Sequence, residues 1–138
     1  MANNKIILIS CSKKKGIQKN KAEHLYQSPL FKSSYTYAKN QKPQAIYILS
    51  AKYGLLSPDT IIEPYNQTLN KMKIAERKKW SENIIYTLKD KHSLENDIFI
   101  ILAGKKYYEY FIKSLSNIKL PLEHLKIGER LRKLNNIR

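Results

Sequence analysis

The sequence predicts one α/β domain over residues 1–138, with a mainly parallel central sheet of about four strands flanked by helices. Three short apolar runs at residues 5–10, 45–50 and 97–103 indicate the sheet, because each is rich in Ile and nearly continuous. Continuous runs are typical of parallel strands that are buried on both faces. The segments between them have helical spacing, and this β-α-β order favours right-handed crossovers within a single domain.

The remaining elements follow in order along the chain. The first helical segment spans residues 22–40, and we expect Pro29 to break or restart it. The longest helix is expected over residues 70–92. Its expected core contacts are Trp80, Ile84, Ile85 and Leu88. Three elements follow the third strand: a helix over residues 105–115, a short strand over 118–122 and a basic helix over 125–134.

Residues 50–69 form a long connection without a clear period. Connections longer than about 12–15 residues are usually functional or disordered. The segment contains several large apolar side chains, which argue against disorder: Tyr53, Leu55, Leu56, Ile61, Ile62 and Tyr65. We therefore predict that this loop is a structured part of a functional site.

Charge is the first indication of function. The chain has 26 Lys and Arg residues against 11 Asp and Glu residues, a formal net charge of +15. Such an excess favours an acidic partner, and nucleic acid is the commonest one. We predict a nucleic-acid partner, with DNA favoured over RNA. The alternative is a compositional bias toward Lys in which most of the charges are simply solvated.

Several classes of protein are excluded or disfavoured. No apolar run approaches the 18 or so residues of a membrane span, and no basic amphipathic segment stands apart from the core pattern, so we expect no membrane partner. The single Cys excludes a disulfide framework and a multi-cysteine zinc site. No phosphate-binding glycine motif of an ATP or NAD enzyme is present, and we expect neither a cofactor nor a metal. The amino terminus lacks a signal-peptide pattern, which predicts a cytoplasmic protein.

Small residues followed by a lysine end each of the three predicted strands. The exits are Ser10-Cys11-Ser12-Lys13, Ser50-Ala51-Lys52 and Ala103-Gly104-Lys105. The carboxyl ends of parallel strands meet at one edge of the sheet, where ligands bind. Small residues there admit a ligand to the backbone, and free N–H groups at a helix start bind anions. We predict a phosphate site at this edge; the alternative is three independent surface lysines.

Cys11 and two carboxylates are the candidates for chemistry. We expect Cys11, beside Lys13, Lys14 and Lys15, to be a small buried residue that seats the loop, with a thiolate nucleophile as the alternative. Asp59 and Glu63 are the candidate catalytic groups, because a carboxylate near a positive site activates water or stabilises a cationic sugar. The alternatives are a turn at Ser57-Pro58-Asp59 and a salt bridge from Glu63 to a lysine.

Aromatic rings and basic clusters complete the predicted surface. Tyr53 and Tyr65 are expected to stack on a base, while Tyr37, Tyr47 and Tyr86 are assigned to packing. Basic residues crowd the start of the longest helix and the end of the chain, where cations at a helix start oppose its dipole. From these clusters we predict four contacts to a nucleic-acid backbone, which are Lys73, Arg77, Arg130 and Arg132.

These motifs together resemble a family of small bacterial and phage proteins of largely uncharacterised function. The shared blocks are residues 11–15 (CSKKK), 25–31 (LYQSPLF), 49–56 (LSAKYGLL) and 63–69 (EPYNQTL). A more distant likeness, through the Cys-Ser-x-x-Lys loop that begins at Cys11, is to the uracil-DNA-glycosylase-like domain of archaeosine synthases. Residues 63–66 also look like the Asp-Pro-Tyr-His loop of uracil-DNA glycosylases, with Glu63 for Asp and Asn66 for His. The resemblance implies a uracil-DNA-glycosylase-like or Rossmann-like fold and a nucleobase pocket.

Three functions remain open from the sequence. The leading prediction is a nucleic-acid enzyme of the DNA glycosylase type, which hydrolyses the N-glycosidic bond of a modified base in a phage-defence or DNA-modification context. The first alternative is a non-catalytic module that binds nucleic acid or a nucleotide. The second is a small-molecule enzyme that processes nucleosides or nucleotides.

Overall fold

Five strands form the central sheet, in the spatial order β4 (Gly54–Leu56), β3 (Ala45–Ser50), β1 (Lys5–Ser10), β6 (Ile98–Leu102) and β7 (Asn117–Lys119). The structure is a computed structural model that describes residues 4–13 and 15–137. All neighbouring strands are parallel except β3 and β4, which are antiparallel. The prediction of a single, mainly parallel α/β domain is therefore confirmed.

β1 is the centre of the sheet and explains its layered structure. Its residues Ile6, Ile7, Leu8 and Ile9 are buried, so the strand presents apolar side chains to both faces. It pairs in parallel with β3 on one side and β6 on the other, with Ile6 opposite both Ala45 and Phe99. A sheet that is apolar on both faces has to be covered on both faces.

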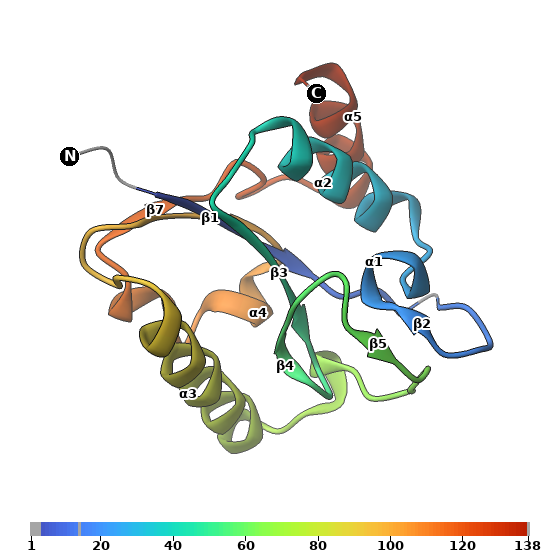
Figure 1. Cartoon of the computed structure of the whole chain (residues 1–138), viewed down its shortest axis with the longest axis horizontal. Coiled ribbons are helices and arrows are strands. Elements are labelled where there is room, and N and C mark those ends of the chain that lie inside the picture. Colours follow the sequence, from blue (N-terminus) through green and yellow to red (C-terminus); the bar gives the residue numbers. More distant parts are fainter. Residues whose placement is uncertain (1–3, 14, 138) are drawn as a thin grey trace.

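Helices supply that cover (Figure 1). α2 (Pro29–Asn40) and α5 (Ile127–Ile137) lie side by side on one face, and α3 (Ile74–Lys91) and α4 (Lys105–Tyr108) lie on the other. Of the four core contacts predicted for the longest helix, Trp80, Ile84 and Leu88 are buried and Ile85 is half-buried. The core therefore fills both layers between sheet and helices.

Pro29 restarts the first helical segment, as the sequence predicts. A short helix, α1 (Ala22–Leu25), ends before it, and α2 begins at Pro29. Ser28 is the N-cap of α2, because its Oγ accepts a hydrogen bond of 3.1 Å from the N–H of Phe31. Proline is well tolerated at this first helical position, where its missing N–H has no partner to lose.

The long connection after β3 contains strands that the sequence does not predict. Gly54 adopts a φ of 72° and lets the chain reverse, so that β4 pairs antiparallel with β3 and Ser50 lies opposite Gly54. Further along, β5 (Ile61–Ile62) pairs with β2 (Asn20–Lys21) in a separate two-stranded sheet. These pairings give the loop regular structure, and its structured character is confirmed.

Other boundaries differ from the predictions. A short 3-10 turn, η1 (Leu69–Lys71), precedes α3, so the longest helix starts at Ile74 rather than at residue 70. The helix predicted over residues 105–115 is divided into α4 and a second 3-10 turn, η2 (Ile112–Ser114), and the break turns Phe111 into the core. β7 ends at Lys119 rather than at residue 122.

The three tyrosines assigned to packing differ in burial. Tyr47 is buried and Tyr37 is half-buried, but the packing role predicted for Tyr86 is wrong, because 77% of that residue is exposed on α3. Within residues 4–13 and 15–137, no helix is both long enough and apolar enough to cross a membrane.

Candidate functional site

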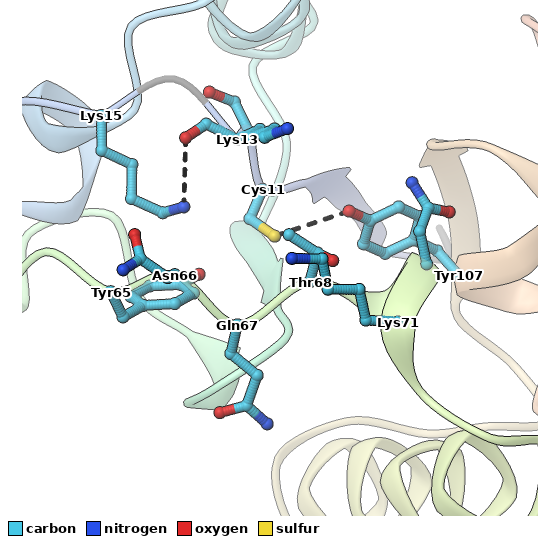
Figure 2. Close-up of a pocket in the computed structure, with 11 residues that line it drawn as sticks. Cys11, Lys13, Lys15, Tyr65, Asn66, Gln67, Thr68, Lys71 and Tyr107 are labelled. Carbon is cyan, nitrogen blue, oxygen red and sulfur yellow. Dashed lines mark hydrogen bonds between the residues drawn. The ribbon is translucent and has the colours of Figure 1, made fainter.

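A cavity of about 540 Å³ opens at the carboxyl edge of the sheet, beside the end of β1. Figure 2 shows its walls, which come from the loop after β1, the segment that leads into η1, and α4. We call it the strand-edge cavity, and its lining residues are 11–13, 15, 65–68, 70, 71 and Tyr107. This is the edge where ligands bind in open α/β sheets.

The lining of the strand-edge cavity is polar and basic. It contains three lysines, Lys13, Lys15 and Lys71, and three side-chain amides, whereas none of its described residues is Asp or Glu. Clustered ammonium groups favour an anion. Amides both donate and accept hydrogen bonds, which suits the edge of a nucleobase.

Buried hydroxyl groups form the floor beneath this cavity. The hydroxyl of Tyr65 lies 2.6 Å from that of Tyr26 and 2.8 Å from Oγ of Ser50. The same Oγ accepts a 2.9 Å hydrogen bond from the N–H of Tyr53, and the carbonyl of Ser50 accepts one of 2.9 Å from Nε1 of Trp80. Burial raises the pKa of Tyr65 well above its usual range and that of Tyr26 to about 12. Both phenols therefore stay protonated and hold the Tyr65 ring in place.

Lys15 projects over this ring (Figure 2). Its Nζ lies 4.3 Å from the centre of the Tyr65 ring and 5.8 Å from that of Tyr26, within the range of cation–π contact. It also donates a long hydrogen bond of 3.4 Å to the carbonyl of Lys13. Burial lowers the pKa of Lys15, and the nearby Cys11 opposes this shift only in part.

Cys11 faces Tyr107 on the opposite wall (Figure 2). The Sγ atom lies 3.6 Å from the Tyr107 hydroxyl, whose pKa burial raises well above its usual range with a further contribution from Cys11. The Tyr107 ring packs edge-on against Trp80, with centroids 6.2 Å apart. Cys11 is half-buried, and in the described part of the chain no group of three or more His, Cys, Asp or Glu side chains is placed to hold a metal ion.

The structure brings part of the predicted site together. Cys11, Ser12, Lys13 and Tyr65 line the strand-edge cavity, and Ser50 supports its floor. A further predicted residue, Tyr53, lies beside it, with its ring centroid 5.6 Å from that of Tyr65 and 38% of the residue exposed. Lys14 lies outside the described residues.

The other strand-exit lysines do not join this cavity. Lys52 is exposed, and its Nζ lies 5.3 Å from the centre of the Tyr53 ring. Lys105 lines a second cavity of about 330 Å³ together with Arg130. Gly104, the N-cap of α4, lies next to this second cavity and within reach of the Arg130 side chain. Parallel strands thus bring the exits to one edge, but their lysines diverge.

Neither candidate carboxylate lines the strand-edge cavity. Asp59 is exposed in a turn that is closed by a 3.1 Å hydrogen bond from the N–H of Thr60 to the carbonyl of Ser57. Glu63 is exposed too, and it forms no ion pair with any residue that the structure describes. The turn predicted as the structural alternative for Asp59 is therefore present. The salt bridge predicted as the alternative for Glu63 does not form within residues 4–13 and 15–137.

The four predicted backbone contacts have different surroundings. Lys73 and Arg132 are exposed. The side chain of Arg77, by contrast, is only 11% exposed. Its guanidinium donates a 2.6 Å hydrogen bond to the Glu109 carboxylate and lies 5.2 Å from the centre of the Tyr110 ring. Arg130 is half-buried and donates a 2.8 Å hydrogen bond to the Leu125 carbonyl. Packing therefore gives Arg77 and Arg130 partners within the fold, a role that their sequence context does not indicate.

Five residues that line the cavity are absent from the predicted site: Asn66, Gln67, Thr68, Asn70 and Lys71. The first four lie within five positions after Tyr65. Lys71 belongs by sequence to the basic cluster at the start of the longest helix. Two signals in the sequence point to this segment: the run of side-chain amides, and its place in the shared block at residues 63–69, which contains the glycosylase-like loop. They become informative only once the fold is known to bring this segment into the same cavity as Cys11.

The fold and the cavity define a class: a parallel α/β protein with a basic, amide-lined site at the carboxyl edge of its sheet. More particularly, the chain belongs to the family of unknown function DUF6884, whose family model matches residues 6–136. No match was found among curated proteins or among solved structures. The resemblance to a family of uncharacterised function is confirmed.

Proposed function

We propose that this protein acts on nucleic acid and holds one nucleotide in the strand-edge cavity. The observation that carries the proposal is the lining itself, in which three lysines, three side-chain amides and two tyrosines surround about 540 Å³ without a carboxylate among the described residues. The lysines provide partners for phosphate, and amides and rings suit a base. The net charge of +15 supports a polyanionic rather than a small neutral ligand.

Salt-dependent binding of oligonucleotides tests this proposal. We would measure fluorescence anisotropy of labelled single-stranded DNA, duplex DNA and RNA over a salt series. The double variant Lys13→Glu with Lys71→Glu is expected to bind weakly and to lower the salt slope by about one for each phosphate that the protein no longer neutralises. The matched control is Lys5→Glu with Lys89→Glu, which changes charge equally at exposed positions at the amino edge of the sheet. Equal weakening in both variants would overturn the placement of the nucleotide.

Base excision is the reaction that we propose for this site. Its support is the likeness to the uracil-DNA-glycosylase-like domain of archaeosine synthases and a cavity volume that lies within the range of small-molecule sites. A screen of DNA that carries modified bases, with detection of abasic product, tests this reaction. If folded protein forms no abasic product from any substrate, base excision is overturned and only the binding of a nucleotide remains proposed. Asp59→Asn with Glu63→Gln is expected to keep affinity; loss of base release in that variant would assign water activation to these carboxylates.

A further inference from the structure

We propose that Lys15 is a nucleophilic amine that forms a Schiff base with the aldehyde carbon of a phosphorylated sugar in the strand-edge cavity. This inference rests on the proposed function, since an abasic deoxyribose in DNA is such a sugar: its C1′ is an aldehyde in the open form and phosphates flank it. It adds a reactive group to a site whose predicted carboxylates lie elsewhere.

The position of Lys15 is the first observation. Its chain segment is held by an isolated antiparallel bridge to Tyr26, and the amine lies 4.3 Å above the Tyr65 ring inside the cavity. The ring in turn is fixed by its hydroxyl contacts to Tyr26 and Ser50. The amine is therefore directed at the ligand space by a buried support. Lys52, by contrast, is exposed and does not line the cavity.

The lack of a counter-ion is the second observation. Lys15 forms no ion pair within the described residues, and its cavity contains two further lysines, Lys13 and Lys71. Partial burial favours the neutral amine, which is the nucleophilic form. The lowered pKa of Lys15 agrees with this geometry. Lys13 and Lys71 meanwhile remain available for the phosphate.

The chemistry balances without a cofactor. The lone pair of Lys15 Nζ forms a bond to the carbonyl carbon, and the π pair of the C=O bond moves to oxygen. The oxygen then leaves as water, which carries away the two hydrogens of the amine and leaves an imine. The Tyr107 hydroxyl lines the same cavity and keeps its proton because of its raised pKa, so it supplies a hydrogen-bond donor for the departing oxygen. Water reverses the step and restores the amine.

Reductive trapping tests the proposal on the intact chain. Folded protein is treated with ribose 5-phosphate and cyanoborohydride, and each reduced adduct is located by peptide mass spectrometry. We expect Lys15 to carry the major adduct, with less labelling by ribose, which lacks the phosphate. Lys15→Arg, which keeps the charge but forms no such imine, should lose that adduct, whereas Lys89→Met should keep it. Lys89 is exposed on α3, so this control removes one lysine outside the site.

The outcomes separate this inference from the proposed function. Adducts spread over exposed lysines, with Lys15 labelled no more than the others, would overturn the nucleophile even if oligonucleotides bind with the expected salt dependence. Selective labelling of Lys15 in a protein that does not bind oligonucleotides would keep the amine and overturn the nucleic-acid substrate. Fluorescence of Trp80 confirms that each variant is folded. A DNA strand with one abasic site, trapped in the same way, then tests the polymer directly.

Discussion

Removal of the Tyr65 hydroxyl should measure how strongly the floor of the cavity is held. In Tyr65→Phe the ring stays, but its hydrogen bonds to Tyr26 (2.6 Å) and Ser50 (2.8 Å) can no longer form. Oγ of Ser50 keeps the N–H of Tyr53 as a partner, so the larger penalty falls on the buried Tyr26 hydroxyl. Each lost hydrogen bond contributes about 1 kcal/mol net, and the Tyr26 hydroxyl is left poorly satisfied. Together these losses predict a decrease of roughly 1–3 kcal/mol in the free energy of unfolding.

Urea unfolding followed by Trp80 fluorescence is the assay. Trp80 is the only Trp in the chain, and its indole N–H binds the carbonyl of Ser50, so the signal comes from the floor itself. With a slope of about 2 kcal/mol per molar urea, the midpoint should fall by roughly 0.5–1.5 M. The control is Tyr86→Phe, which removes a hydroxyl from an exposed ring and should change stability by less than about 0.5 kcal/mol.

A double-mutant cycle with Tyr26→Phe isolates the interaction between the two hydroxyls. Because each single variant breaks the same bond, the double variant should be destabilised by at least about 0.5 kcal/mol less than the sum of the singles. Strict additivity, or a Tyr65→Phe variant as stable as Tyr86→Phe, would refute the hydrogen-bonded floor. The same variants assayed for oligonucleotide binding then show whether ring position affects the site.

Two further predictions concern other parts of the fold. Arg77→Ala should destabilise the protein by about 1–3 kcal/mol, which is less than the loss of a fully buried pair because the Glu109 side chain is 24% exposed. Adding Glu109→Gln should restore part of the stability in the same urea assay, and no restoration would contradict the pairing. His92 Nε2 lies 2.7 Å from the Tyr47 hydroxyl, and burial lowers the pKa of His92 in the folded protein. On acidification, His92 is therefore protonated in the unfolded chain first. The free energy of unfolding should fall as the pH drops below about 6.5, by at most ~1.4 kcal/mol per pH unit. His92→Gln should flatten that difference in a pH series of melts, and parallel curves for both proteins would count against the assignment.

Local sequence determined the elements whose signal is local. The run at residues 45–50 predicts β3 with its observed bounds, and the run at residues 5–10 does the same for β1. A buried parallel strand needs apolar side chains on both faces, so its composition alone reveals it. Pro29 likewise acts on its own backbone, and the helix restart that it causes is predictable without any distant contact. The parallel direction predicted for these strands also predicts that ligands bind at the carboxyl edge of the sheet.

Only the tertiary structure decided what each charged or aromatic residue does at that edge. Lys15 and Lys52 both follow strands, yet one amine lies over the buried ring of Tyr65 and the other over the exposed ring of Tyr53. Arg77 belongs to the basic helix start in the sequence, but packing of α3 against α4 pairs it with Glu109. Tyr65 becomes a fixed floor because its hydroxyl meets Tyr26, 39 positions away in the chain. Such pairings depend on contacts between segments that are remote in sequence, and no local propensity or periodicity carries that information.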